Sequence, residues 1–209
     1  MKAGDIPKRI GIFGGSFNPV HRAHCRIAEE FIDQAKCDIC YFIPTAVSPF
    51  KEEQPLYVND MHRLTMLRLA TEYHPKFLVS DIEILRGGVS YTIDTINALR
   101  ELHPHSQLFL LIGQDQAGEF HRWKDWKLIV DYVQLCIVRR PDTIAQQKEI
   151  TKQLTHANKV PQWIQCLEMN ISSTEIRENI RQGIEIDEMV SPQVMEYIQV
   201  NHLYGYKDG

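Results

Sequence analysis

The side chains best suited to chemistry in this sequence are His21 and His24, which stand three residues apart and follow a run that begins with Gly14 and Gly15. Residues three apart share one face of a helix, so two imidazoles at this spacing can contact one ligand together. The glycines leave backbone N–H groups uncovered, and the first turn of a helix presents further free N–H groups and the positive end of its dipole. These features favour an anion, above all a phosphate. A histidine on a helix is often an ordinary surface residue, and the glycines before this pair are what favour a site.

The elements that must position these residues are a strand and a helix. Residues 9–13 are short and apolar, as in a strand buried on both faces. Asn18-Pro19 marks a turn, because the residue before proline avoids the α region. Residues 22–36 then carry apolar side chains on one face of a helix, and residues 38–43 form a second apolar strand. A strand, a helix and a strand of this length form a right-handed crossover in a parallel sheet.

Strand and helix patterns alternate along the rest of the chain. This alternation predicts a Rossmann-like, doubly wound α/β fold: a parallel sheet with helices on both faces and a C-terminal helical segment, in a single domain over residues 1–209. Asp60 is expected to cap a helix, Ser172 with Glu175 forms a capping box for a helix that stops at Gly183, and Ser191-Pro192 starts the last helix. The predicted strands here are 77–84, 107–112, 132–138 and 163–169, and the predicted helices are 61–70, 91–103, 143–155 and 174–182.

Ligands of such sheets bind at the carboxyl ends of the strands. Several segments with glycine or polar residues follow predicted strands. We therefore expect them to gather at one edge of the sheet and form one site; they are residues 14–16, 45–51, 113–115, 139–140 and 172–173.

The composition is that of a globular protein. Of the 209 residues 44% are hydrophobic, no apolar run approaches the ~18 residues of a spanning helix, and the N-terminus lacks a signal-peptide core, so we expect a cytoplasmic protein without a membrane partner. The formal net charge of -4 argues against nucleic acid as a partner but not against a small phosphorylated ligand. The five cysteines form no disulfide framework or zinc pattern, and Cys37-x-x-Cys40 is expected to pack near the start of a strand. The oligomeric state stays open, a homo-oligomer included.

The stretch from Ile10 to His24 resembles the G-[ST]-F-[DN]-P-x-H-x-G-H signature of the nucleotidyltransferase superfamily. Ala23 stands where that family usually has glycine. Alanine is nearly as small, so the helix can still approach phosphates unless the position needs an unusual backbone angle. Ile171-Ser-Ser-Thr-Glu-Ile-Arg177 is similar to the family's second signature, I-S-[ST]-[ST]-x-I-R. By itself this second segment would be ordinary helix capping, and the resemblance is what assigns it a ligand.

Three middle segments resemble the nicotinate-nucleotide adenylyltransferases of this superfamily: residues 90–95 (S-Y-T-x-D-T), 112–115 (I-G-x-D) and 120–123 (L-x-x-W). The resemblance extends from Lys8 to Tyr204. It implies transfer of the adenylyl group of ATP to nicotinate mononucleotide, which yields deamido-NAD and pyrophosphate in NAD biosynthesis. Because the attacking phosphate is already an anion, catalysis would rest on positioning and electrostatic stabilisation, with Mg²⁺ carried by the ATP phosphates and not by a dedicated metal site.

The resemblance also implies roles for single residues. His21, His24 and Arg177 would be catalytic. ATP would be bound by Gly14, Gly15, Ser16, Phe17, Lys51, Gly113, Asp115, Ile171, Ser172 and Ser173, and nicotinate mononucleotide by Asn18, Tyr91, Thr92, Trp123 and Arg140. Lys51 ends the segment Ser48-Pro49-Phe50-Lys51, in which phenylalanine replaces the family's histidine.

Plainer alternatives exist for several of these roles. The N–H groups of Tyr91 and Thr92 could bind a carboxylate or belong to a simple helix cap, and Trp123 could stack on a pyridinium ring or fill the core. Asp115 could accept ribose hydroxyls or cap a helix, and Lys51 and Arg140 could be solvated surface. The alternative functions are the same chemistry on nicotinamide mononucleotide or another phosphorylated acceptor such as phosphopantetheine, and a nucleotide-binding sensor without catalysis.

Overall fold

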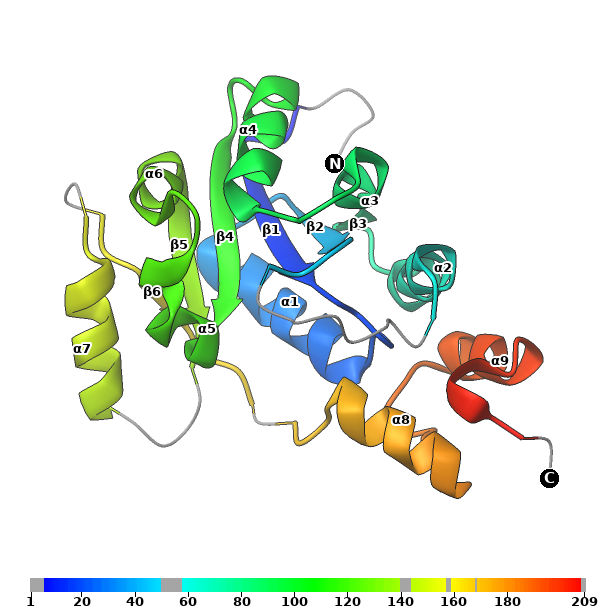
Figure 1. Cartoon of the computed structure of the whole chain (residues 1–209). Helices are drawn as coiled ribbons and strands as arrows, with labels where there is room; N and C mark the ends of the chain where they lie inside the picture. The colour runs from blue at the N-terminus through cyan, green and yellow to red at the C-terminus, as the bar shows by residue number, and fades with distance from the viewer. Residues whose placement is uncertain (1–5, 50–57, 140–143, 157–158, 168, 208–209) are drawn as a thin grey trace.

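The sheet at the centre of the molecule has six parallel strands. The structure is a computed structural model that describes residues 6–49, 58–139, 144–156, 159–167 and 169–207. The strands lie in the order β3-β2-β1-β4-β5-β6, so the chain winds outward in both directions from β1 and β4 (Figure 1). The doubly wound parallel sheet predicted from the sequence is therefore confirmed. The six strands are β1 (Arg9–Gly15), β2 (Ile39–Pro44), β3 (Phe77–Val79), β4 (Gln107–Gly113), β5 (Val133–Val138) and β6 (Gln162–Ile164).

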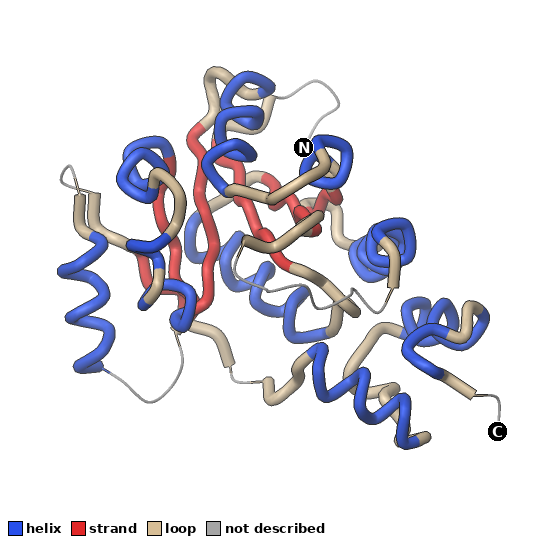
Figure 2. Tube along the Cα trace, viewed as in Figure 1, coloured by secondary structure: helices blue, strands red, loops and turns tan. Residues whose placement is uncertain are grey.

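Helices cover both faces of this sheet, as Figure 2 shows by the blue helices on either side of the red strands. The long connections between parallel strands require such crossovers. The helical elements, with η for 3₁₀ turns, are α1 (Arg22–Ala35), α2 (Asp60–Thr71), α3 (Ile82–Arg86), α4 (Thr92–Leu102), α5 (Gln114–Gly118), η1 (Phe120–Arg122), α6 (Trp126–Tyr132), α7 (Ile144–Leu154), α8 (Ser173–Gln182), α9 (Pro192–Val200) and η2 (Leu203–Gly205).

The sheet separates two hydrophobic cores, because successive side chains of a strand point to opposite faces. Leu108 and Leu110 of β4 pack in the core formed with α4, α6 and α7. Phe109 and Leu111, between and after them, pack in the core formed with α1, α2, α8 and α9. Gly11 of β1 allows α1 to approach closely, since a Cβ atom there would lie 2.6 Å from the ring of Phe31.

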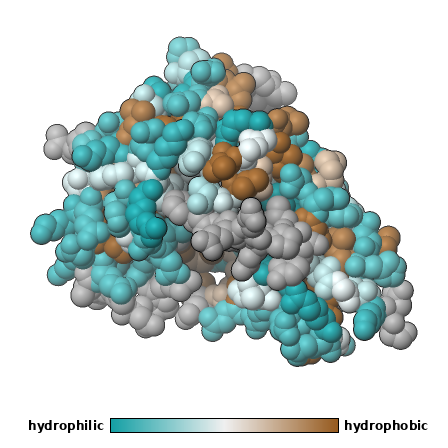
Figure 3. Space-filling view, in the orientation of Figure 1, coloured by the Kyte–Doolittle hydropathy of each residue, from teal (hydrophilic) through white to brown (hydrophobic). Residues whose placement is uncertain are grey.

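The C-terminal helical segment packs beside α2, where α8, α9 and η2 gather at the right of Figure 1. Its helix caps are those the sequence predicts. Ser172 Oγ accepts from the N–H of Glu175, Gly183 ends α8 with φ at 69°, and Ser191 Oγ accepts from the N–H of Val194. Within the described ranges, no helix is both long and apolar enough to cross a bilayer. The face drawn in Figure 3 is mostly hydrophilic, with apolar side chains in smaller groups.

The predicted strand over residues 77–84 is wrong beyond Val79. β3 ends there, and Ile82–Arg86 form the short helix α3. The burial of side chains explains the error: Glu83 is buried while its neighbours Ile82 and Ile84 are only partly buried, which reverses the apolar-inside alternation that the strand prediction assumed. Tertiary packing thus overrides the local pattern in this segment.

Two other local predictions need correction. Asp60 does not cap α2, because Asn59 Oδ1 accepts the N–H of His62 at 3.0 Å. Asp60 is instead the first helical residue and pairs with the buried guanidinium of Arg63 at 2.6 Å. The strand predicted over residues 163–169 ends at Ile164, since the chain beyond it leaves the sheet and lines a cavity. By contrast, Cys37 and Cys40 are buried, as expected.

Candidate active site

The two histidines lie at the start of α1, where His21 is the N-cap residue and His24 belongs to the first turn. His21 is the residue before the helix, with extended backbone angles, and its N–H donates to Nδ1 of His24 over 3.2 Å. The two rings lie with their centroids 3.7 Å apart. Because Nδ1 of His24 accepts a hydrogen bond, the neutral ring is assigned its proton on Nε2, which leaves Nε2–H as a donor for a ligand.

Burial keeps both imidazoles neutral. It lowers the pKa of His21 to about 4, and it lowers the pKa of His24 well below its usual value, with His21 adding to the effect. The ordinary pKa of histidine, near 6.5, would make both protonation states accessible at neutral pH, and burial shifts both rings toward the neutral form. Among the described residues, Nδ1 of His21 is buried without a hydrogen-bond partner. Leaving such an atom unsatisfied costs free energy, which is part of the cost of burying this ring.

Gly14 and Gly15 matter for their lack of a side chain, and not for an unusual backbone conformation. Gly14 and Gly15 continue β1, and neither has a positive φ; the chain turns at Phe17, whose φ is 45°. A Cβ atom on Gly15 would lie 3.1 Å from the ring of Phe17, while Gly14 meets no neighbouring atom closer than 4.0 Å. Phe17 in turn packs against His24, with ring centroids 5.0 Å apart. Because residue 15 is glycine, the ring of Phe17 has room to pack against His24.

The first cavity has a volume of about 700 Å³ and lies between the starts of α1 and α8. Both helices point their first turns, with free N–H groups and positive dipole ends, at the same space. Ala23 lies in this wall with helical backbone, so its replacement of glycine requires no unusual angle. The lining residues include His21, Ala23, His24, Arg139, Cys166, Leu167, Met169, Ile171, Ser172 and Ser173.

Side chains of α8 also donate hydrogen bonds to the loop that follows β1. Ser173 Oγ donates to the carbonyl of Pro19 at 2.8 Å, across 154 positions of sequence. Arg177 donates through Nη1 to the carbonyl of Asn18 at 2.7 Å and through Nη2 to Thr174 Oγ1 at 3.2 Å. Arg177 therefore lies beside the first cavity and does not line it.

A second recess lies at the ends of β1, β2 and β4. Its volume is about 180 Å³, and a further space of about 310 Å³ shares Ser90, Thr92 and Trp123 with it. Tyr91 precedes α4 without capping it by its side chain, so the first N–H groups of that helix face this region without a side-chain acceptor from the cap. The ring of Trp123 packs on Phe120 at 4.8 Å between centroids.

A buried carboxylate supports the floor of this recess. Thr95 Oγ1 donates to Glu83 Oε1 at 2.7 Å and accepts from Arg86 Nη2 at 3.0 Å. Glu83 and Thr95 are both almost inaccessible, and both line the recess. This chain of hydrogen bonds ties α3 to the first turn of α4 and so fixes where Thr92 lies.

The predicted site residues separate into groups. The first cavity brings together His21, His24, Ile171, Ser172 and Ser173, and the second recess with its neighbour brings together Gly14, Gly15, Ser16, Tyr91, Thr92 and Trp123. The predicted residues that line none of these spaces are Phe17, Asn18, Gly113, Asp115 and Arg177. Lys51 and Arg140 lie outside the described residues.

Several lining residues received no individual role from the sequence, although some of them lie in segments that it selected. Arg139 directly follows β5, and the strand-end rule that selected residues 139–140 could have chosen it over Arg140. Glu83 was hidden by the wrong strand prediction, and Leu167 and Met169 by the overlong one. Ser90 lines the recess and accepts the N–H of Ala46 at 3.0 Å, a contact that sequence alone does not reveal.

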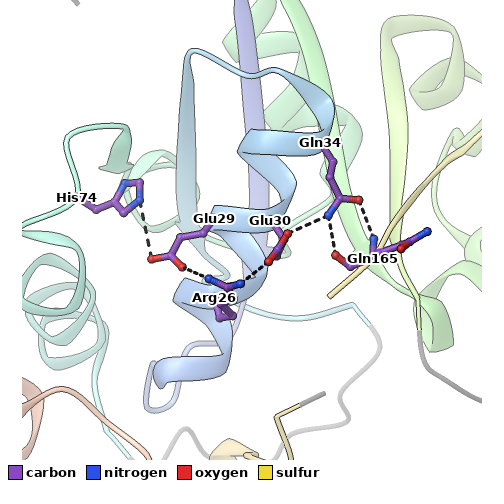
Figure 4. A network of polar contacts seen from close by, with 6 residues as sticks. All are labelled: Arg26, Glu29, Glu30, Gln34, His74 and Gln165. Atoms are coloured by element: carbon purple, nitrogen blue, oxygen red, sulfur yellow. Dashed lines mark hydrogen bonds and ion pairs between the residues drawn. The ribbon is translucent and has the colours of Figure 1, made fainter. Parts of the chain in front are cut away.

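Figure 4 shows how α1 holds the segment that leads to the first cavity. The side-chain amide of Gln34 donates to the carbonyl of Gln165 at 2.6 Å and accepts its N–H at 2.9 Å. Gln34 also bonds Glu30, which forms an ion pair with Arg26. Gln165 is followed directly by Cys166 and Leu167, which form part of the cavity wall.

In the part of the chain that the structure describes, no group of three or more His, Cys, Asp or Glu residues could hold a metal ion. The polar groups around the first cavity are imidazoles, hydroxyls, a guanidinium, helix N–H groups and one carboxylate, that of Glu175, so donors that suit phosphate oxygens outnumber the ligands a cation prefers.

A parallel sheet whose strand order reverses between β1 and β4, with a recess at the ends of these two strands and a cavity between the starts of α1 and α8, has the architecture of a nucleotide-binding α/β protein. A family model described as cytidylyltransferase-like matches residues 12–179. A probable nicotinate-nucleotide adenylyltransferase from Carboxydothermus hydrogenoformans is 36% identical over 200 residues, which cover 94% of this chain and 98% of that protein. The nicotinate-nucleotide adenylyltransferase of Bacillus subtilis is 34% identical over 197 residues, with the same coverage of each chain. The chain belongs to this family of nucleotidyltransferases.

The solved structures agree on the fold. Nicotinic acid mononucleotide adenylyltransferase of Plasmodium falciparum, complexed with NaAD, superposes with a TM-score of 0.77 at 20% sequence identity and covers 96% of this chain and 98% of that one. A putative nicotinate-nucleotide adenylyltransferase from Vibrio parahaemolyticus gives a TM-score of 0.66 at 18% identity, over 94% of this chain and 95% of that one. The family resemblance found in the sequence is confirmed by the family model and by the two curated relatives.

Proposed function

We propose that the protein transfers the adenylyl group of ATP to the 5′-phosphate of nicotinate mononucleotide, forming deamido-NAD and pyrophosphate in NAD biosynthesis. The observation that carries this proposal is the convergence of two helix starts and the histidine pair on one cavity, beside a recess with a helix start and an indole. The curated relatives named for this activity, at 36% and 34% identity over nearly the whole chain, support it.

The first cavity suits ATP. Its volume accommodates a nucleotide, and its wall combines apolar residues such as Leu167 and Met169 with the donors at the helix starts. Phosphates would accept from Nε2–H of His24 and from the N–H groups of α1 and α8. Arg177 would act from beside the cavity, because its positive charge lies at the start of α8 and its guanidinium holds the loop after β1.

The second recess suits the acceptor. Trp123 offers a flat face to an electron-poor pyridinium ring, and the start of α4 at Thr92 offers N–H groups to the carboxylate of nicotinate. A Cβ atom on Gly14 would lie no closer than 4.0 Å to its neighbour, the carbonyl oxygen of Ile43, which leaves open space beside β1 at this recess.

The reaction needs little covalent chemistry from the protein. The acceptor phosphate attacks the α-phosphorus of ATP, a new P–O bond forms, and the bond to the β-phosphate breaks to release pyrophosphate. His21 and His24 would bond the phosphates as negative charge moves to the leaving group, and a proton taken up there would strengthen the contact. Mg²⁺ would arrive bound to ATP and neutralise part of the phosphate charge.

The test is an assay of pyrophosphate release by the full chain with MgATP and nicotinate mononucleotide. His24→Ala removes a donor from the centre of the cavity and should lower kcat by about 10²-fold or more. The matched control is His105→Ala, because His105 is exposed and precedes β4 at the opposite edge of the sheet. Absence of turnover by the wild type, or an unimpaired His24→Ala variant, would contradict the proposal. ATP binding without turnover would support the sensor alternative.

A further inference from the structure

The loop between β1 and α1 is held from outside by side chains that come from distant parts of the chain. Its carbonyls and one side chain accept four hydrogen bonds, which we call the loop clamp. The bonds are Arg63 Nη1 to Ser16 O at 2.8 Å, Arg177 Nη1 to Asn18 O at 2.7 Å, Ser173 Oγ to Pro19 O at 2.8 Å and Tyr204 Oη to Asn18 Oδ1 at 2.7 Å.

Tyr204 makes the longest-range of these contacts, 186 positions from Asn18 in the sequence. It lies in η2, near the C-terminus, and its φ of 60° is unfavourable for a residue with a side chain. Such a conformation persists only where the surroundings compensate for it, and the buried bond to Asn18 is one such compensation. Burial raises the pKa of the Tyr204 hydroxyl, so this group remains a donor throughout the physiological pH range.

Asn18 accepts two of the four hydrogen bonds of the loop clamp. It is only 5% exposed, it lines none of the three spaces at the site, and both its backbone carbonyl and its side-chain oxygen are used by the clamp. Its contacts are therefore those of a residue that shapes the loop and not of one that touches a ligand. One residue away, Phe17 adopts its positive φ and packs on His24.

The hydrogen bonds to the loop carbonyls restrict the orientation of the peptide units in the loop. A loop whose carbonyl oxygens are bound on its outer side cannot rotate its peptide units freely. Gly14, Gly15 and His21 lie at the two ends of this clamped segment and line the second recess and the first cavity. By fixing the loop, the clamp therefore fixes the position of His21 in the first cavity relative to Gly14 and Gly15 in the second recess.

We propose that Tyr204 is a positioning residue for catalysis, which acts through Asn18 by holding the loop that places the histidine pair between the two substrates. This proposal rests on the function proposed above for the same site. Tyr204 touches neither of the substrate spaces, so loss of its hydroxyl changes no direct contact with a ligand.

The test compares Tyr204→Phe with Tyr206→Phe in the full chain. Tyr206 is a matched control, because its hydroxyl also takes part in a hydrogen bond, but as the acceptor from Gln199 Nε2 at 3.0 Å in the C-terminal segment and not as a donor to the loop. Two readouts are used: kcat/KM for ATP, and the hydrogen–deuterium exchange of the peptide over residues 14–24 without ligand. Melting temperatures show whether both variants are folded.

We expect Tyr204→Phe to lose about tenfold in kcat/KM, the size of effect of one buried neutral hydrogen bond, and to exchange several-fold faster over residues 14–24. Tyr206→Phe should stay within about twofold in both readouts. Adding Tyr204→Phe to Asn18→Ala should cost little more than Asn18→Ala alone, because the two residues act through one bond.

Three outcomes would overturn the proposal. The first is Tyr204→Phe within twofold of the wild type in both readouts, and the second is an equal loss in Tyr206→Phe. The third is faster exchange with unchanged kcat/KM, which would make the bond a stabiliser of the loop without influence on catalysis. If the wild type shows no turnover, the proposed function fails separately, and the clamp is then judged by the exchange and by the affinity for a non-hydrolysable ATP analogue.

Discussion

The N–H of His21 donates to Nδ1 of His24 over 3.2 Å, so the second histidine of the site closes the helix that carries it. This contact requires a lone pair on Nδ1, and it is lost if that nitrogen is protonated. The same bond orients Nε2 of His24 for a ligand. Local helix capping and ligand binding are thus served by one side chain, and both depend on its protonation state.

The first prediction concerns stability and pH. The pKa of His21 is lowered from 6.5 to about 4 by burial, so the unfolded chain binds this proton at a higher pH than the folded protein does. The free energy of unfolding should therefore fall as the pH falls from about 6.5 to 4, by up to about 3 kcal/mol from His21 alone. His24 acts in the same direction.

Urea denaturation of the wild type and of His21→Gln at pH 7.0, 5.5 and 4.5 measures this effect. Carboxylates titrate in the same range, so the difference between the two proteins is the relevant quantity. The wild type should lose more stability than the variant on acidification. Parallel pH profiles for the two proteins would show that His21 is not buried as described.

The second prediction concerns the choice between an acid and an amide acceptor. Lys124 Nζ lies 3.7 Å from Asp94 Oδ1 and 4.5 Å from the centre of the Tyr91 ring, and it lines the space of about 310 Å³ next to the second recess. An ammonium there favours the carboxylate of nicotinate. Since the group is half-exposed, Lys124→Met should lower the acid-to-amide ratio of kcat/KM by only about three- to tenfold.

Lys127→Met is the control for this experiment, because Lys127 lies three residues further on and lines none of the spaces at the site. Asp94→Asn should raise the ratio, since it removes the carboxylate that offsets the ammonium. Equal ratios in wild type and Lys124→Met would assign the discrimination to the start of α4 alone.

The third prediction concerns Gln34, whose amide makes two hydrogen bonds to the backbone of Gln165. Gln34→Ala should loosen the wall of the first cavity, raise KM for ATP by about three- to tenfold and leave KM for the acceptor unchanged. Steady-state kinetics with each substrate varied in turn measures both constants. Gln153→Ala serves as control, because Gln153 bonds only to Glu149 on the exposed side of α7. A rise in both constants would point to general destabilisation.

The fourth prediction concerns the metal. Chelation with EDTA should abolish turnover, because ATP would then lack Mg²⁺. It should leave the melting temperature of the ligand-free protein unchanged, since the described residues form no cluster of metal ligands. A fall of several degrees on chelation, measured by differential scanning fluorimetry, would reveal a metal bound by the protein itself.

Features that depend on neighbouring residues could be predicted well. The strand β1, the helix α1 and the caps at Ser172, Gly183 and Ser191 follow from periodicity and from hydrogen bonds within a few residues. The prediction that Asp60 caps α2 failed, because Asn59 caps the helix and the carboxylate of Asp60 pairs with the buried guanidinium of Arg63. Residues 82–86 failed because packing, and not the local pattern, determines their burial.

The sequence by itself determined the chemistry of the protein: two histidines after a glycine pair, a capped second signature, and a parallel fold that brings strand ends together. The tertiary structure decided which of those residues line a cavity and which support it. Arg177 and Asn18 belong to the second group, because their partners come from segments 159 and 186 positions away. It also decided that the histidines are neutral, since the pKa of an imidazole depends on how much water reaches it. Desolvation and long-range contacts are properties of the packed chain, and no local pattern encodes them.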